Sequence, residues 1–332
     1  MAPLLEVSDL VVRFRTMGMV KALVRGVRDP YLDAVLNVSF RQEQGETFGL
    51  VGESGSGKTT LGRAIIGLVR ASKGSIRFGG QELTRLSNRA YKRYRRDIAM
   101  MFQDPVASLS PRLTVRSLLM EPFRIHGMTD RDLTAEARRL LNMVGLNDSF
   151  FGRFPHEMSG GQARRVGVAR ALSLSPKLII ADEPTAGLDV SVQGEILNLM
   201  GRLQKELGLS YLIITHNLPV VRHVSDRLAI MYLGRFVEQG RTEEIFRHPL
   251  HPYTKALISA VPEPDPDKRR DIVKLEGEVP SLANRPTGCE FHTRCPFAQA
   301  RCRSEAPAPR ELEAGRIVRC HFPLARPTAD AA

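Results

Sequence analysis

The chain has 332 residues, of which 42% are hydrophobic and 25% are charged, and its formal net charge is +12. This length suits one large domain with a smaller one, or two domains, and the composition is that of a globular protein rather than a disordered or fibrous one. No apolar stretch approaches the roughly 20 residues that cross a bilayer, and the N-terminus lacks the basic and apolar regions of a signal peptide. We therefore expect a chain that stays in the cytosol and meets a membrane only through a partner. The dispersed positive charge is weak evidence for an acidic lipid surface and weaker evidence for nucleic acid.

The N-terminal end of the chain contains three predicted strands. Residues 4–14 and 34–40 have the pattern of strands, and the irregular, basic residues 16–33 are expected to form a loop inserted between them. The apolar run at residues 48–51 is the third strand, and it leads directly into a glycine-rich segment.

That segment is the most informative part of the sequence. It reads Gly52-Glu53-Ser54-Gly55-Ser56-Gly57-Lys58-Thr59, which keeps the G-x-x-x-x-G-K-[ST] spacing, and a helical pattern follows it. The glycines let backbone N–H groups wrap phosphate oxygens, and the start of the helix adds partial positive charge. We expect Lys58 to reach the β- and γ-phosphates and Thr59 to hold Mg²⁺. The sequence therefore predicts that the protein binds ATP or GTP.

Three later apolar runs each end in a polar residue. The runs 98–102, 178–181 and 211–215 are followed by Gln103, by Asp182 with Glu183, and by His216. Such runs are typical of strands buried on both faces, and ligands of open α/β sheets bind at the carboxyl ends of the strands. Asp182 is predicted to hold Mg²⁺ and Glu183 to polarise a water for attack on the γ-phosphorus. His216 is predicted to hydrogen-bond the γ-phosphate and orient the water.

A second glycine-bearing helix start lies between these runs. Residues 105–158 are predicted to form a helical lobe, and Met158-Ser159-Gly160-Gly161-Gln162 follows it, with Ser159 as the N-cap of a helix. One nucleotide does not need two anion-binding helix starts from one chain. The interpretation is that this segment covers a nucleotide bound to a different subunit.

The C-terminal part changes character. A hairpin is predicted over residues 227–232 and 236–239, and prolines from residue 249 onward mark a linker. All four cysteines lie beyond it, at positions 289, 295, 302 and 320. Clustered cysteines in a cytosolic chain favour a metal over disulfides. Four thiolates suit tetrahedral zinc or an iron–sulfur cluster, with His292 and His321 as rival ligands.

Together the motifs resemble the nucleotide-binding subunit of an ABC transporter over roughly residues 4–245. Residues 52–59 match the phosphate loop, and Gln103 matches the Q-loop. Residues 158–162 match the signature, residues 178–183 match the Walker B strand with its glutamate, and residues 186–189 match the D-loop. His216 matches the switch histidine, and Phe14 matches the aromatic residue that stacks on adenine. Met158 stands where Leu is usual, and Ala186-Gly187 replaces the commoner Ser-Ala, but both keep apolar or small character. The resemblance implies an α/β fold with a P-loop NTPase (RecA-like) core, an antiparallel β subdomain and a helical subdomain.

The same resemblance assigns the site residues. The implied nucleotide contacts are Phe14, Gly52, Ser54, Gly55, Gly57, Lys58, Thr59, Thr60, Ser159, Gly160, Gly161, Gln162 and Asp189. The implied catalytic residues are Glu183, His216 and Gln103, and the implied Mg²⁺ ligands are Thr59, Gln103 and Asp182.

A narrower resemblance to dipeptide and oligopeptide importers lies in residues 102–112, 251–257 and 288–296. It implies an ABC ATPase domain over 1–247 and a small, cysteine-containing C-terminal domain over 248–332. It also implies a [4Fe-4S] cluster at Cys289, Cys295, Cys302 and Cys320, with Zn²⁺ or no bound metal as the alternatives, and a bound metal would have a structural role.

The importer resemblance implies an ATPase that powers uptake of peptides or a related small solute. Its implied partners are a second, homologous but non-identical ATPase subunit, two transmembrane permease subunits and, indirectly, an extracytoplasmic solute-binding protein, with no nucleic acid. The chain would then lie on the cytoplasmic face of the plasma membrane. Dipeptides, longer peptides, glutathione and nickel all stay open as the solute.

Two other classes of protein compete with this interpretation. A soluble ABC-family ATPase acting on ribosomes or DNA would suit the positive charge, but such proteins usually carry two cassettes or a long coiled-coil insertion. A P-loop kinase or GTPase would not need residues 159–162, and the Asn-Lys-x-Asp motif that reads guanine is absent from the sequence.

Overall fold

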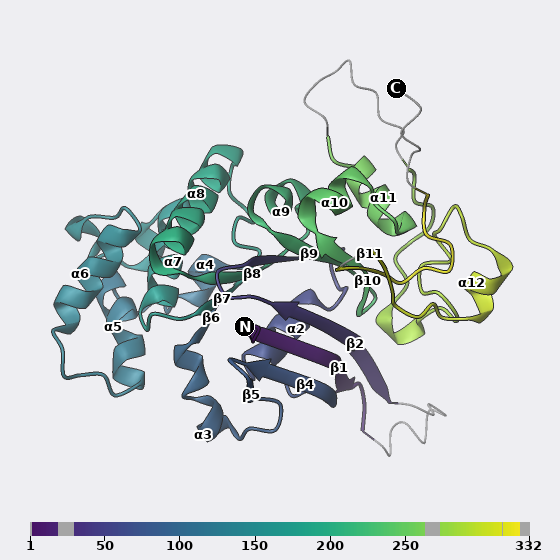
Figure 1. The fold of residues 1–332 in the computed structure, drawn as a ribbon. Helices are drawn as coiled ribbons and strands as arrows, with labels where there is room; N and C mark the ends of the chain where they lie inside the picture. Colours follow the sequence, from purple (N-terminus) through teal and green to yellow (C-terminus); the bar gives the residue numbers. More distant parts are fainter. Residues whose placement is uncertain (1, 19–29, 263–272, 314, 326–332) are drawn as a thin grey trace. The chain divides into compact units, whose positions relative to one another are not determined.

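The structure of the protein is a computed structural model that describes residues 2–18, 30–262, 273–313 and 315–325. The chain forms two compact units (Figure 1): the first combines Met1–Gln42, Phe48–Thr84 and Thr215–Ala332, and the second combines Glu43–Thr47 and Arg85–Ile214. Most of the predicted inserted loop, residues 19–29, lies outside the described residues. Within the described ranges, no helix has both the length and the apolar character that crossing a membrane requires.

The first unit begins with a four-stranded antiparallel sheet in the order β2-β1-β4-β5. Its strands are β1 (Leu5–Arg15), β2 (Tyr31–Gln42), β4 (Lys73–Phe78) and β5 (Gln81–Glu82). The predicted strands 4–14 and 34–40 are confirmed, and the second is longer than expected at both ends. This sheet is the predicted antiparallel β subdomain.

A second set of strands in the first unit follows the order β11-β12-β10-β9-β3. These are β3 (Thr47–Val51), β9 (Arg227–Tyr232), β10 (Arg235–Arg241), β11 (Arg310–Glu313) and β12 (Arg316–Val318). β3 runs parallel to β9, and β9 and β10 form the predicted hairpin. The helices of this unit are α2 (Lys58–Ile65), α9 (Leu218–Val224), α10 (Thr242–Arg247), α11 (Pro252–Ser259), α12 (Ala300–Ser304) and the 3₁₀ turn η4 (Leu282–Asn284).

A separate small C-terminal domain is not confirmed. The residues beyond 248 cluster with the first unit, and strand β12 pairs with β10. Tyr253 and Phe291 are buried in the same hydrophobic cluster as Ile230 of β9. Glu238 of β10 and Arg316 of β12 form a 2.7 Å ion pair in which both side chains are fully buried. The described residues beyond 248 therefore contribute to the core of the first unit, and Leu250, Val318 and Cys320 also form a small buried cluster among themselves.

The second unit contains parallel strands in the order β8-β7-β6, namely β6 (Ile98–Met101), β7 (Leu178–Asp182) and β8 (Ser210–Thr215), whose last residue belongs to the first unit. Every residue of β7 and β8 is buried, as the continuous apolar runs predict. The helices and 3₁₀ turns are α3 (Asn88–Tyr91), η1 (Tyr94–Arg96), α4 (Pro105–Ser108), α5 (Val115–Ile125), α6 (Leu133–Met143), η2 (Asp148–Phe150), η3 (Pro155–Glu157), α7 (Gly160–Leu172) and α8 (Val190–Leu207). The predicted helical character of residues 105–158 is thus observed.

Candidate functional site

The phosphate loop connects the buried strand β3 to helix α2 in the first unit. Gly57 has φ +103°, and a side chain there would collide with the carbonyl oxygen of Ala34. A side chain at Gly52 would collide with the carbonyl oxygen of Met231. Two of the motif glycines are therefore required by the fold itself, because neighbouring backbone approaches closely and one position is left-handed.

Lys58 lies inside the loop, with 7% of its surface exposed. Its Nζ donates to Gly52 O (2.7 Å), Glu53 O (2.8 Å) and the Oγ of Ser56 (3.3 Å). The ammonium group is thus anchored against the loop that would hold the phosphates. A phosphate oxygen arriving there would exchange for these oxygens as a partner of the lysine. Ser54, Gly55, Thr59 and Thr60 complete the predicted loop, and Gly55 has φ +78°.

Two more predicted residues belong to the first unit. Phe14, on β1, pairs in register with Leu32 of β2 and is 40% exposed, so its ring face is available for stacking. His216 is exposed and directly follows β8. The next residue, Asn217, caps helix α9 by accepting from Val220 N at 3.3 Å.

The second unit holds the predicted acidic pair at the end of β7. Asp182 and Glu183 are 2% and 8% exposed. The Glu183 N–H donates to Ile214 O of β8 at 2.7 Å, and Glu183 has φ +51°, a left-handed conformation that is uncommon outside glycine. Backbone strain of this kind concentrates at functional sites, because the surrounding structure must maintain it. Gln103 follows β6 and is exposed.

The signature segment begins helix α7 with a capping box. Ser159 Oγ accepts from Gln162 N (3.3 Å), and the Gln162 side chain accepts from Ser159 N (3.0 Å). The predicted N-cap role of Ser159 is confirmed. A side chain at Gly161 would approach Val192 Cγ1 of α8 to 2.8 Å, and one at Gly160 would approach Leu188 Cδ2 to 3.3 Å. The two glycines therefore let α7 begin close to α8.

Asp189 has a structural role in the second unit. Its carboxylate accepts from Val192 N at 3.0 Å and caps helix α8. The next residue, Val190, is 85% exposed, which is unusual for a valine and marks this end of α8 as an apolar point on the surface. The nucleotide contact expected of Asp189 stays a prediction.

Arg164 is a residue of the site that sequence reasoning missed. It lies on α7 and is 2% exposed. Its guanidinium donates to Gln103 O (3.1 Å) and to Ala186 O (3.0 Å), so one side chain joins the signature helix to the Q-loop and to the segment before Asp189. Burial lowers the pKa of Arg164, while the charges of Asp104 and Glu183 oppose that shift.

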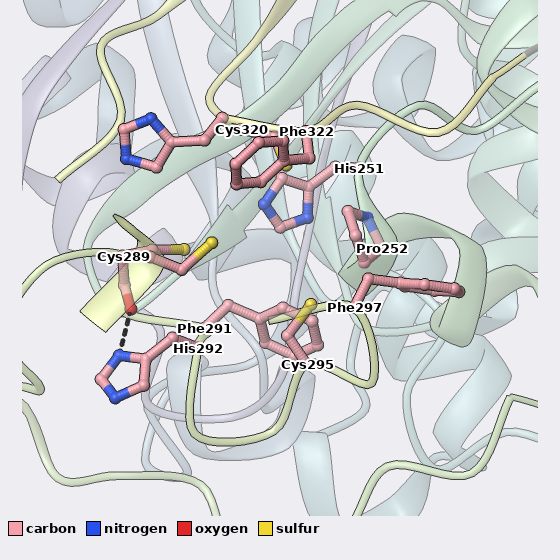
Figure 2. A pocket seen from close by; sticks show the side chains of 11 residues that line it. His251, Pro252, Cys289, Phe291, His292, Cys295, Phe297, Cys320 and Phe322 are labelled. Atoms are coloured by element: carbon pink, nitrogen blue, oxygen red, sulfur yellow. Dashed lines mark hydrogen bonds between the residues drawn. The ribbon is translucent and has the colours of Figure 1, made fainter. Parts of the chain in front are cut away.

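The four cysteines line one small apolar pocket in the first unit (Figure 2). Its other walls are His251, Pro252, Phe291, His292, Phe297, His321 and Phe322, and its volume is about 10 Å³, close to what one water needs. Burial raises the pKa of Cys289 to about 12 and that of Cys320 to about 11. Both side chains are therefore neutral thiols in this state, and a metal would have to displace their protons.

The two histidines beside this pocket have hydrogen-bond partners of their own. Within the described part of the chain, no three His, Cys, Asp or Glu residues are arranged to hold one metal ion. His292 Nδ1 donates to Cys289 O at 2.8 Å, and His321 Nε2 donates to Glu305 O at 2.9 Å, so each rival imidazole has one nitrogen engaged elsewhere. The side chains of Cys289, Cys295, Cys302 and Cys320 all line this one pocket.

Comparisons with known proteins agree with this geometry. Residues 35–186 match the family described as ABC transporter, and residues 237–302 match the family described as oligopeptide/dipeptide transporter, C-terminal region. The oligopeptide transport ATP-binding protein AppF of Bacillus subtilis is 50% identical over 293 residues, covering 87% of this chain and 89% of AppF. The oligopeptide transport ATP-binding protein OppF of Escherichia coli is 47% identical over 308 residues, covering 92% of each chain.

Solved structures give the same class. The ATP-binding cassette MJ0796, in a dimeric post-hydrolysis state with ADP and Pi, is 26% identical with a TM-score of 0.63 over 72% of this chain and 98% of its own. CbiO1 of Clostridium perfringens, part of an ABC transporter complex, is 27% identical with a TM-score of 0.62 over 74% of this chain and 91% of its own. The fold and phosphate loop define a nucleotide-binding ATPase cassette. The chain belongs to the ABC transporter family, as an ATP-hydrolysing subunit.

Proposed function

We propose that this chain is an ATPase subunit that powers oligopeptide import through an ABC transporter. The observation that carries the proposal is the joint presence, in one chain, of the phosphate loop at residues 52–59 and a C-terminal extension that matches the oligopeptide/dipeptide transporter family. The relatives AppF and OppF, both oligopeptide transport ATP-binding proteins, match along most of the chain. A role on ribosomes or DNA is not favoured by these relatives.

The proposed mechanism assigns a task to each motif. Phe14 stacks on adenine, and the backbone N–H groups of the loop bind phosphate oxygens while Lys58 exchanges its loop oxygens for the β- and γ-phosphates. Thr59, Gln103 and Asp182 would hold Mg²⁺, which would supply charge neutralisation at the phosphates. Glu183 is the general base for the attacking water, and His216 orients that water at the γ-phosphate. Each role rests on residue type and on the family resemblance.

The segment 159–162 is proposed to cover a nucleotide bound to a second ATPase subunit. Its exposed helix start offers N–H groups and partial positive charge to the phosphates of that nucleotide. Gln103 then links the state of the γ-phosphate to the position of the helical lobe, and hydrolysis releases the clamp. The second subunit is homologous and non-identical in this proposal.

The remaining partners follow from the transporter role. Two permease subunits span the membrane, this chain lies on their cytoplasmic side, and an extracytoplasmic solute-binding protein delivers the peptide. Reconstitution of the complex into vesicles tests the function. Labelled peptide should enter the vesicles only with Mg·ATP, and Lys58→Ala should abolish this uptake. The control is Arg77→Ala, which removes an exposed ion pair with Glu82 in the β2-β1-β4-β5 sheet and should leave uptake unchanged. Glutathione and nickel are tested separately as alternative solutes. ATP-driven uptake of one of them, without uptake of peptide, would reject the proposal.

We further propose that Cys289, Cys295, Cys302 and Cys320 hold a [4Fe-4S] cluster in a structural role. The support is their convergence on one apolar pocket in a segment that adds few other elements of regular structure. Anaerobically purified protein should be brown and contain about four irons per chain. Cys302→Ser should lose the colour, and colourless wild-type protein that contains one zinc per chain would reject the assignment.

A further inference from the structure

An ion pair joins Arg294, in the C-terminal extension that follows residue 248, to Glu53 of the phosphate loop. Arg294 lies between Cys289 and Cys295, directly before the second of them. Its two terminal nitrogens donate to the two carboxylate oxygens of Glu53, at 3.0 and 3.2 Å. The Arg294 side chain is 8% exposed and that of Glu53 is 26% exposed, so water screens the pair weakly. Two parallel bonds to one carboxylate fix orientation as well as distance.

The backbone of Glu53 has a second anchor from the same extension. The Glu53 N–H donates to the hydroxyl of Tyr253, on α11, at 3.3 Å. The ring of Tyr253 is fully buried and packs 5.3 Å from Phe291 and 4.8 Å from Tyr232, measured between centroids. Phe291 also lines the cysteine pocket. Tyr253 belongs to a hydrophobic cluster against which Cys289 and Cys295 pack, and Arg294 directly precedes Cys295, so both anchors of Glu53 come from the vicinity of these two cysteines.

Glu53 is also one of the three residues whose oxygens accept hydrogen bonds from Lys58. The carbonyl oxygen of Glu53 accepts from Lys58 Nζ at 2.8 Å and from Ser56 N at 3.2 Å. A displacement of Glu53 would therefore move the lysine and the turn that follows.

We propose that Arg294 is a positioning residue of the nucleotide site: its fork to Glu53 ties the phosphate loop to the cysteine-bearing segment 289–295 and holds the loop ready for ATP. The proposal rests on ATP binding at residues 52–59. A loop fixed before the ligand arrives loses less conformational entropy on binding. Loss of the tether should therefore weaken ATP binding in the ground state and the transition state alike, which raises KM and spares kcat.

The test compares Arg294→Ala with Arg301→Ala in the full chain and in the assembled transporter. Arg301 is a matched control, because it directly precedes Cys302 as Arg294 precedes Cys295. It also forms a bidentate pair, with Glu305 at 2.7 and 3.0 Å, but on an exposed surface away from the loop. Fluorescent ATP-analogue binding gives the affinity, ATPase kinetics give KM and kcat, and absorbance near 400 nm reports the cysteine pocket.

Arg294→Ala should raise the analogue Kd and the KM for ATP about tenfold, which corresponds to about 1.4 kcal/mol of binding free energy. The kcat should stay within about twofold, and Arg301→Ala should match the wild type. Arg294→Lys, which keeps the charge but not the fork, should recover part of the affinity. In a double-mutant cycle, Arg294→Ala should cost little more once Glu53→Gln is present.

The inference would be overturned by an unchanged KM in Arg294→Ala, by a KM that falls in this variant, or by an equal change in Arg301→Ala. An effect of Arg294→Ala that is undiminished in the Glu53→Gln background would do the same. These failures are distinct from failure of the proposed function, in which the wild-type chain itself would not bind the ATP analogue.

Discussion

Replacing Arg164 with methionine tests whether this buried cation joins the motifs of the second unit. The change removes two charged hydrogen bonds, to Gln103 O at 3.1 Å and to Ala186 O at 3.0 Å, and leaves both carbonyl oxygens short of a donor. Two such bonds contribute about 3–6 kcal/mol, and part of this is offset because the methionine no longer buries a charge. We expect a net loss of about 3 kcal/mol of unfolding free energy.

The measurement is urea unfolding of the purified chain together with ATPase activity in the transporter. Arg165→Met is the control, because Arg165 is the next residue on α7 and bonds Val144 O (2.9 Å) and Glu195 (2.8 Å), neither of which belongs to a nucleotide motif. The control should lose about 1 kcal/mol and keep its ATPase rate within about twofold. Arg164→Met should lose activity at temperatures where it is still folded. The reasoning is refuted if Arg164→Met loses under about 1 kcal/mol and hydrolyses ATP at the wild-type rate.

Three further predictions concern single positions. Glu183→Gln should retain ATP binding and reduce hydrolysis by about 10²–10⁴-fold in single-turnover assays, and native turnover would remove Glu183 as the base. Gly57→Ala should abolish ATP-analogue binding, because its side chain would meet Ala34 O at φ +103°, whereas Gly152→Ala, where nothing lies within 4 Å, should bind normally. Arg316→Met should lower the unfolding free energy by about 3–5 kcal/mol, because it leaves Glu238 buried without its cation. A change below about 1 kcal/mol in urea unfolding would contradict the buried ion pair between β12 and β10.

Local patterns in the sequence predict the parts of this fold that depend on neighbouring residues. The continuous apolar runs at 178–181 and 211–215 predict the buried strands, and the spacing of Ser159 and Gln162 matches the observed capping box. The glycine loop is predicted because its chemistry requires that spacing. These features succeed because strand burial, helix capping and phosphate binding are each set within a few residues.

Long-range contacts explain what the sequence did not predict. In the sequence, nothing distinguishes Arg164 from other arginines on a helix. Its hydrogen-bond partners, Gln103 and Ala186, lie 61 and 22 residues away in the chain. The short, charged strands β11 and β12 form because β12 pairs with β10 and β11 pairs with β12. The burial of Tyr253 and Phe291 in one cluster with Ile230 of β9 also depends on contacts between residues far apart in the chain. Arg294 likewise takes its role from Glu53, which lies 241 residues earlier in the chain.

The most direct test of the central claim is photocleavage of the assembled transporter with ADP and vanadate trapped at the γ-phosphate position. Ultraviolet light cuts polypeptide next to bound vanadate, and mass spectrometry locates the cuts. A nucleotide enclosed by the phosphate loop of one ATPase and the signature of another should produce cuts both within residues 52–59 and within residues 159–162. Cuts confined to the phosphate loop would contradict the enclosed, two-subunit pocket.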